Sequence, residues 1–314
     1  SLAAEVALNY VELRAAQSRL AIARANLTSQ SETLQLTDWR AQAGLASSLD
    51  VEQARTTVEQ TRAQIPSLET SRVEAENRLA ILLGRIPGSL ARELAEPAPL
   101  PGVPDAVAVG IPAETLARRP DVRASERRLA AETARIGVAE AARYPGLTLS
   151  ASIGLDALKS ADLLTRSALS HSLLASLAAS VFDGGRLRHQ VEIQNAVQDR
   201  ALIAYESAVL TALEETENAL TGLANARHRQ AALQDATGAA RLAALLAHDR
   251  YSSGSVDFQT VLTTERTLLA SEDSLASAKA DSVSALIRLY KALGGGWTPQ
   301  PATDRQDSYQ GKRS

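Results

Sequence analysis

The sequence predicts a mainly α protein built from very long antiparallel helical hairpins, with one β-hairpin between them. Three features of the 314-residue chain predict this fold. Runs rich in Ala, Leu, Glu and Arg continue far beyond the length of an ordinary globular helix. One helical hairpin is repeated later in the chain without a gap. Two segments of about ten residues alternate between apolar and small side chains, as strands with one apolar face do.

Composition excludes several kinds of site. The chain has no Cys and a net charge of −3. Structural disulfides and thiolate metal sites are therefore excluded, and nothing favours nucleic-acid binding. No run of about eighteen apolar residues is present, so the sequence predicts no transmembrane helix.

The first predicted hairpin has its tip at Gly44. Residues 1–43 are expected to form one helix, which Gly44 ends. A second helix over 49–83 returns antiparallel, and Gly84 ends it as a C-cap. Pro66 lies inside this second helix and should kink it.

A connector and a third helix follow. Residues 85–117 are rich in Pro and are predicted to contain no long element. Arg119-Pro120-Asp121 then provides a stop and a cap, and a helix is expected up to Arg143. Pro145 ends this run because it lacks a backbone donor and restricts the preceding residue.

Directly after this helix the sequence predicts a β-hairpin over about 146–182. Leu147–Leu155 alternates strictly, with apolar residues on one side and Thr, Ser and Gly on the other. Residues 156–171 are interpreted as a loop, and 172–181 alternate again with Leu174 as the one misfit. About ten residues is the length of a transmembrane β-strand. The same alternation could also belong to a soluble hairpin.

A second, longer helical hairpin ends the chain. Asp183-Gly184-Gly185 turns into a helix expected from Arg186 to about Gly254. About 65 residues at about 1.5 Å each give about 100 Å, which requires a long bundle or tube. Residues 258–293 return antiparallel, and 295–314 are expected to form a loose polar tail.

The two hairpins are copies of one another. Gly254 and Gly294 follow Gly44 and Gly84 by the same 210 residues. Side chains at this spacing match as well: Glu5 and Glu215, Leu13 and Leu223, Arg40 and Arg250, Val51 and Val261, Leu83 and Leu293. Repetition of this length indicates duplication. The predicted divisions are a first repeat (1–84), a connector (85–117), a second repeat (118–294) and a tail (295–314).

The duplication leads to an expectation about the region upstream. The second copy is preceded by a helix, a β-hairpin and a helix start over 117–210, whereas the first copy begins at Ser1. We therefore expect the chain to be N-terminally truncated, with roughly ninety further residues upstream that hold another β-hairpin.

Two or four strands cannot close a barrel by themselves. Open strand edges are excluded from lipid because each unpaired backbone group costs several kcal/mol, and about eight strands are the practical minimum. The chain is therefore expected to assemble with copies of itself, and cyclic symmetry is the usual arrangement.

Three stretches together resemble the outer-membrane factors, the trimeric exit-duct channels of tripartite multidrug efflux and type I secretion systems. They are RRPDVRASERRLAAETARIGVAEAARYPGLTLSASIGL (118–155), FDGGRLRHQVE (182–192) and LIRLYKALGGGW (286–297). The resemblance implies a homotrimer. Its three chains would share one transmembrane β-barrel, and their helical hairpins would form a hollow α-barrel across the periplasm.

The resemblance also implies a function. The protein would be a passive, non-enzymatic export duct for drugs or other small solutes in the outer membrane of a Gram-negative bacterium. Its partners would be a periplasmic adaptor (membrane fusion) protein, an inner-membrane pump and outer-membrane lipid. No cofactor is implied. Any signal peptide and lipid-anchored Cys would lie upstream.

The same resemblance assigns the periplasmic aperture to the hairpin tips. The candidate residues are Gly44, Asp50, Tyr251, Gly254, Asp257, Thr260 and Thr263. Many relatives carry acidic side chains one turn past the glycine, whereas this chain has Thr260 and Thr263 there. Asp50 and Asp257 are the nearest carboxylates, and a ring of them would bind cations. Each also lies at a helix start, where an N-cap role is an equal alternative.

Tyr144 and Phe182 lie at the open end of the predicted β-hairpin. Aromatic residues at one rim are typical of a membrane interface, and if this rim faces the periplasm the tips lie about 100 Å away.

Other chemistry has little support. Asp183-Gly184-Gly185 lacks the Lys and the spacing of a phosphate loop and is interpreted as a plain turn. The four His residues show no metal-ligand spacing, and no nucleophile elbow supports Ser-His-Asp catalysis. The main alternative is a soluble periplasmic adaptor or coiled-coil scaffold, which would carry a lipoyl-like β-domain that the sequence does not show.

Overall fold

The computed structural model describes residues 2–104, 117–156 and 169–295. By contacts the chain forms two compact units: 1–115 with 213–314, and 116–212. Helix α5 (Arg186–Ser252) contributes to both units. The domain divisions expected from the repeat stay a prediction.

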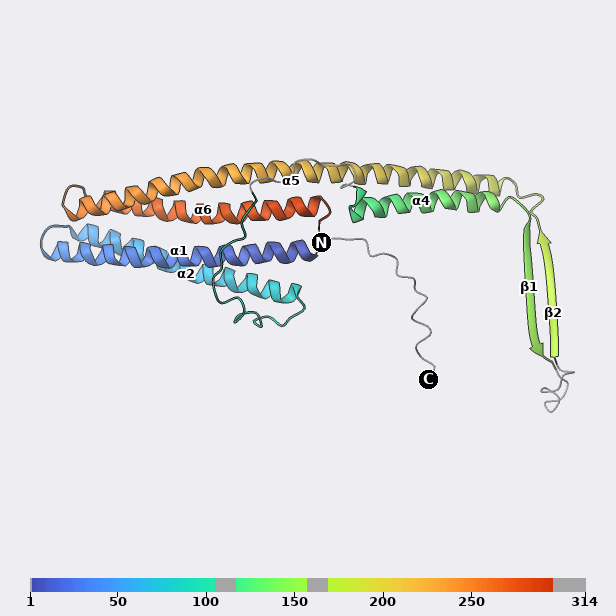
Figure 1. Cartoon of the computed structure of the whole chain (residues 1–314), viewed down its shortest axis with the longest axis horizontal. Helices are drawn as coiled ribbons and strands as arrows, with labels where there is room; N and C mark the ends of the chain where they lie inside the picture. The colour runs from blue at the N-terminus through green and yellow to red at the C-terminus, as the bar shows by residue number, and fades with distance from the viewer. Residues whose placement is uncertain (1, 105–116, 157–168, 296–314) are drawn as a thin grey trace. The chain divides into compact units, whose positions relative to one another are not determined.

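The first unit is helical. α1 (Leu2–Gln42) and α2 (Ser48–Leu82) form the first hairpin, and α6 (Phe258–Ala292) lies along α1 (Figure 1). These bounds agree with the predicted helices to within one or two residues. α2 continues through Pro66, and the predicted kink stays a prediction. α5 contains 67 residues, which confirms one helix about 100 Å long.

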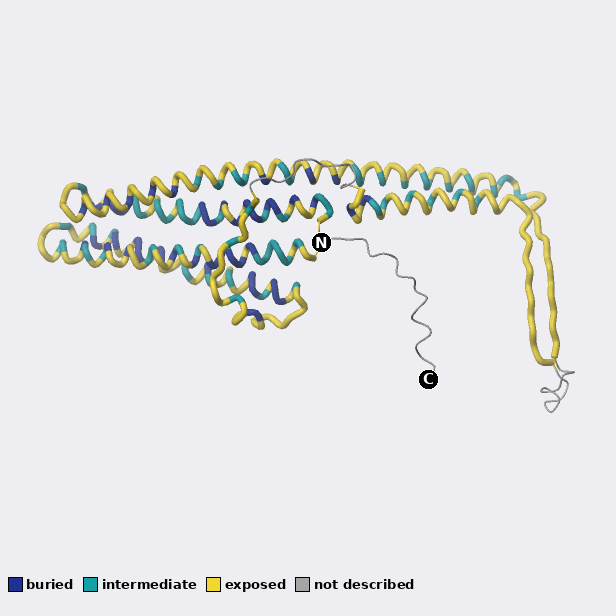
Figure 2. The backbone as a smooth tube through the Cα atoms, in the orientation of Figure 1, coloured by how far each residue is buried: buried dark blue, intermediate teal, exposed yellow. Residues whose placement is uncertain are grey.

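The core of this unit is a series of small clusters along the helices. Buried positions recur on α1, α2 and α6 (Figure 2). One cluster joins Leu13 to Leu79 and the connector residue Leu90, and another joins Leu223 of α5 to Leu286 and Leu289 of α6. Many of the buried residues are Ala, so helices can pack closely without one thick core.

The four glycines predicted to end helices share one geometry. Gly44, Gly84, Gly254 and Gly294 have φ between 70° and 76°. At Gly44 the backbone N–H donates to Ala41 O at 3.0 Å, and the next N–H donates to Arg40 O at 2.7 Å. The other three glycines repeat this pattern of a Schellman C-cap. The left-handed conformation explains why glycine occupies all four positions.

The connector is held against α1 by two buried polar side chains. Arg14 donates to Glu96 O and Gln17 donates to Leu94 O, each at 2.7 Å. Both side chains are buried, and Arg14 also donates to the Gln17 amide oxygen at 2.8 Å. Residues 85–104 contain no helix or strand, as predicted, and 105–116 lie outside the described residues.

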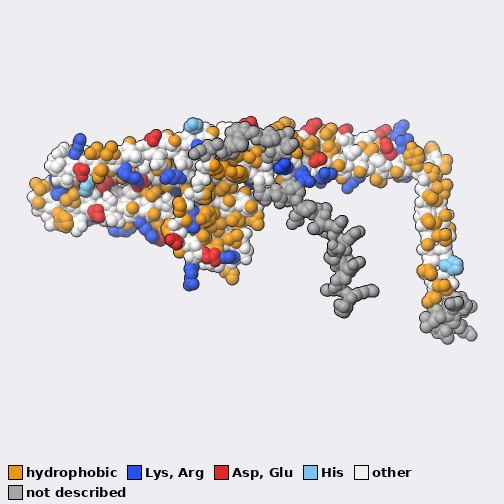
Figure 3. Space-filling model, in the orientation of Figure 1, with side chains coloured by type: hydrophobic (Ala, Val, Ile, Leu, Met, Phe, Trp, Pro, Cys, Tyr) orange, Lys and Arg blue, Asp and Glu red, His pale blue; other side chains and the backbone are white. Residues whose placement is uncertain are grey.

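The second unit contains α4 (Pro120–Ala141), β1 (Gly146–Leu155), β2 (Leu169–Ala178) and the first part of α5. β1 and β2 pair antiparallel, with Leu147 opposite Leu177 and Leu155 opposite Leu169. The predicted β-hairpin is therefore confirmed. Both strands are exposed along their whole length, and apolar side chains follow them (Figures 2 and 3).

The predicted bounds of the second strand were wrong by three residues at each end. β2 covers Leu169–Ala178 rather than 172–181, so 169–171 belong to the strand and not to the loop. In the observed register residue 179 would face Pro145, which has no N–H to donate. Pairing therefore stops at Ala178. The remainder of the predicted loop, 157–168, and the tail from 296 lie outside the described residues.

Within the described part of the chain, none of the helices combines the length and the apolar character needed to cross a membrane.

Candidate functional site at the helical hairpin tips

Both hairpin tips have a hydroxyl residue and an aspartate three positions apart at the helix start, but in opposite order. At the start of α2, Ser47 is the N-cap and Asp50 the third helical residue; Asp50 Oδ2 lies 2.8 Å from Ser47 Oγ. At the start of α6, Asp257 is the N-cap and the Thr260 hydroxyl donates to its carboxylate at 2.6 Å. Each tip thus holds one hydroxyl bonded to one carboxylate, and both pairs satisfy free N–H groups of a helix start.

The expected N-cap role is therefore correct for Asp257 and wrong for Asp50. Asp50 accepts the Ser47 N–H at 2.9 Å, and its own N–H donates to Ser47 Oγ at 3.2 Å. This is a capping box, in which the residue three positions after the cap reaches back. Ser47 occupies the N-cap, so Asp50 lies in the first turn of α2.

The charge of Asp257 is stabilised by its cap. The hydroxyl of Thr260 and then its backbone N–H donate to the carboxylate, and together they lower the pKa of Asp257 below its ordinary 3.8. The side chain of Asp257 is exposed and ionised at neutral pH. It can therefore present a fixed negative charge at the tip.

Tyr251 is buried rather than exposed at the tip. It is 4% exposed, and its ring lies 5.7 Å from that of Phe258. Ala247 of α5, Ala54 of α2, and Val261 and Leu262 of α6 complete this tip cluster. The cluster takes residues from both repeats, so packing joins the two tips.

Arg40 makes the polar link between the tips. Its guanidinium donates to Tyr251 O at 2.9 Å and Ser252 O at 3.4 Å, and it lies 4.5 Å from the centre of the Tyr251 ring. A cation at these carbonyls also interacts favourably with the negative end of the α5 dipole. From the sequence, Arg40 is predicted only to be the match of Arg250. A basic residue in the last turn of a helix was the available signal.

The remaining candidate residues lie at the surface of the tips. Gly44, Gly254, Thr260 and Thr263 are exposed, and the Thr263 hydroxyl donates to Gln259 O in its own helix at 2.8 Å. Of the candidate residues, Tyr251 of the second repeat thus contacts the first repeat, at Arg40. The aperture role of all seven residues stays a prediction.

The predicted interface residues lie in the second unit. Tyr144 is 74% exposed and Phe182 is 92% exposed. Tyr144 comes two residues before Gly146, and Phe182 four residues after Ala178, the last pair of the sheet. Both thus flank the same end of the β-hairpin. Their contact with a membrane stays a prediction.

The Asp183-Gly184-Gly185 segment is a helix cap. The Asp183 carboxylate accepts the N–H groups of Leu187 and Gly185, each at 2.9 Å, and these bonds lower its pKa. They satisfy donors at the start of α5, which agrees with a turn. Among the described residues no group of three His, Asp or Glu side chains could hold a metal ion.

Duplicated helical hairpins with packed tips and a β-hairpin with an exposed apolar face agree with the fold of one known family of outer membrane proteins. The chain belongs to the outer membrane efflux protein family, whose model matches residues 1–85 and 111–295.

Known proteins resemble the chain over nearly all of its length. It is 37% identical to the pyoverdine export outer membrane protein OpmQ of Pseudomonas aeruginosa over 309 residues, 98% of this chain and 63% of OpmQ. It is 34% identical to the outer membrane protein OprJ of the same species, over 95% of this chain and 62% of OprJ. The chain therefore spans less than two thirds of these relatives.

Solved structures of outer-membrane proteins have the same fold as this chain. The outer-membrane channel OprN superposes with a TM-score of 0.86 at 39% identity, over 95% of this chain and 67% of OprN. The outer membrane protein VceC from Vibrio cholerae superposes with a TM-score of 0.79 at 26% identity, over 95% of this chain and 70% of VceC. The predicted family and fold class are confirmed.

Proposed function

We propose that the chain is a subunit of a passive export duct in the outer membrane of a Gram-negative bacterium. Three copies would share a transmembrane β-barrel and a periplasmic tube of helical hairpins. A periplasmic adaptor and an inner-membrane pump would open the duct for drugs or other small solutes. Family membership and similarity to relatives such as a toluene efflux pump outer membrane protein of Pseudomonas putida support this proposal.

The exposed apolar face of the β-hairpin is the observation that carries the proposal. Five large apolar side chains on this face are between 67% and 77% exposed: Leu147, Leu149, Ile153, Leu173 and Leu177. Exposure of this row of apolar side chains to water is energetically unfavourable. The row also lies on a two-stranded sheet whose outer edges have unpaired backbone groups. Lipid contact on the apolar face and pairing with strands of sister chains would satisfy both.

Single introduced cysteines test this arrangement without background labelling, because the 314-residue sequence contains no Cys. Leu149→Cys and Ile153→Cys would report on the apolar face, and Ser150→Cys and Ser152→Cys on the other. In outer membranes, a water-soluble maleimide should label the Ser positions rapidly and the Leu and Ile positions slowly. Equal labelling of both faces, or recovery of the protein in the soluble periplasm without detergent, would exclude the duct.

We further propose that the tips form the closing aperture. Asp257 supplies a carboxylate with a lowered pKa at an exposed position, and threefold symmetry would arrange three of them in a ring. Gly44, Asp50, Gly254, Thr260 and Thr263 would surround it, with Tyr251 buried behind. In a reconstituted duct, Asp257→Asn should reduce selectivity for cations, and the Glu59→Gln substitution on α2 should leave it unchanged.

The proposal leaves no role for catalysis, because a duct needs a path and a gate rather than reacting groups. The alternative of a soluble adaptor or scaffold would require the β-hairpin to be covered by protein of its own chain. Both of its strands are fully exposed instead.

A further inference from the structure

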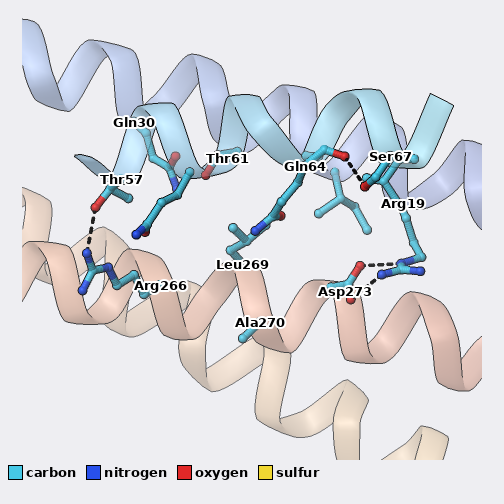
Figure 4. A pocket seen from close by; sticks show the side chains of 14 residues that line it. Arg19, Gln30, Thr57, Thr61, Gln64, Ser67, Arg266, Leu269, Ala270 and Asp273 are labelled. Atoms are coloured by element: carbon cyan, nitrogen blue, oxygen red, sulfur yellow. Dashed lines mark hydrogen bonds and ion pairs between the residues drawn. The ribbon is translucent and has the colours of Figure 1, made fainter. Parts of the chain in front are cut away.

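A cavity lies between α1, α2 and α6 in the first unit, away from the hairpin tips (Figure 4). Its volume is about 420 Å³, which is within the range of small-molecule sites, roughly 300–1,000 Å³. All three helices belong to the unit that forms the helical hairpins. The site is therefore built by one chain.

Gln30 is the most unusual residue of this cavity. It is 3% exposed, and neither its amide nitrogen nor its amide oxygen has a hydrogen-bond partner among the described residues. Its side chain points into the space between the helices (Figure 4). A buried primary amide without partners is costly, so the position is explained best by a group that fills the cavity and bonds to it.

Two further polar side chains of the wall lie near Gln30. Thr61 is 2% exposed and lines the cavity. The Gln64 amide points into the cavity beside it (Figure 4). Each of these groups can both donate and accept a hydrogen bond.

Charged groups lie at the two ends of the cavity. Arg19 makes two hydrogen bonds to the Asp273 carboxylate, at 2.6 and 3.0 Å. At the other end Arg266 donates to the Thr57 hydroxyl at 3.1 Å (Figure 4). A pure acceptor such as an oxyanion would pair with the Gln30 nitrogen and leave its oxygen unpaired. A hydroxyl group serves both atoms, since it donates and accepts.

We propose that this cavity binds a neutral, hydroxyl-rich small molecule of monosaccharide or disaccharide size. Hydroxyls would pair with Gln30, Thr61 and Gln64, and the carbon skeleton would lie against Leu68 and Leu269 of the wall. This site is separate from the duct proposal and does not depend on it, because binding can be measured without transport.

Saturation-transfer NMR with glucose and trehalose tests the site. The protein should be kept in a detergent without a sugar headgroup, so that detergent cannot occupy the cavity. We expect transfer to trehalose and a saturable titration. Gln30→Leu and Thr61→Val should each weaken the apparent affinity about tenfold, as loss of one net hydrogen bond does.

Thr37→Val is the matched control. Thr37 is also on α1 and fully buried, but its hydroxyl donates to Thr33 O at 2.8 Å and does not line the cavity. This variant should bind trehalose within twofold of the wild type, and thermal melting should verify that all three variants fold. Absence of transfer to both sugars, equal binding by Gln30→Leu, or displacement of trehalose by inorganic sulfate would overturn the proposal.

Discussion

The Arg40 guanidinium lies 4.5 Å from the centre of the Tyr251 ring and donates to the Tyr251 carbonyl at 2.9 Å. These residues come from different repeats, and their side chains join the tip of α1 to the end of α5. The link is asymmetric, because Arg250, the copy of Arg40 in the second repeat, is exposed. Duplication therefore supplied two arginines, of which one connects the tips.

Arg40→Ala should loosen the tips. The variant loses a cation over an aromatic ring and a charge-assisted hydrogen bond, which together contribute about 2 kcal/mol. Hydrogen exchange of the amides of 251–255 should become correspondingly faster. Arg250→Ala is the control. We expect it to change the opening free energy of these amides by less than about 0.5 kcal/mol. Equal effects of the two variants would contradict the role of Arg40.

Gly254→Ala should destabilise the second tip by about 1 kcal/mol, because a side chain is strained at φ 76° although nothing lies within 4 Å of the new Cβ. Gly238→Ala should change the stability in the opposite direction. Gly238 lies inside α5 with equally open space, so alanine there should stabilise the helix by about 0.5–1 kcal/mol. Thermal melting of both variants checks this contrast, and two shifts of the same sign would refute it.

The cap of α6 should weaken only in acid. The folded-state pKa of Asp257 is lowered below 3.8 by the two Thr260 donors, so its contribution is fully present above the unfolded value. It is lost as the pH falls through the folded pKa. Exchange protection of the Thr260 amide should therefore be constant from neutral pH to about 5 and decline below about 4. Asp257→Asn should remove this decline, whereas Ser47→Ala, at the other tip, should leave it intact.

Glu265 should respond to pH in the opposite direction. Burial raises its pKa above 4.5, and the Thr33 hydroxyl, which donates to it at 2.7 Å, compensates only in part. The folded state therefore binds the proton more tightly, and stability falls as the pH rises from the unfolded pKa through the folded one. Glu265→Gln should raise the melting temperature at pH 7 and change it little at pH 4.

Glu59→Gln is the control for this titration. Glu59 forms an exposed ion pair with Arg62 one turn away on α2, and such pairs contribute little. Its melting temperature should follow the wild type at both pH values. If Glu265→Gln lowers the melting temperature at pH 7, the carboxylate stabilises the fold and the inference from its pKa is wrong.

The sequence by itself determined the features that depend on neighbouring residues. Helix lengths, the four glycine caps and the alternating strand β1 follow from propensity, capping and periodicity over a few residues. The 210-residue spacing then predicted that the caps at Gly44 and Gly254 are equivalent, and both have the same left-handed geometry.

Only the tertiary structure decided which residues meet across the chain. The ends of β2 depend on its register with β1, where Pro145 stops the pairing, and alternation in β2 alone could not fix them. The Arg40–Tyr251 link joins residues 211 apart, and the burial of Gln30 depends on α2 and α6. Local rules act within about one helical turn, whereas these contacts depend on which helix faces meet.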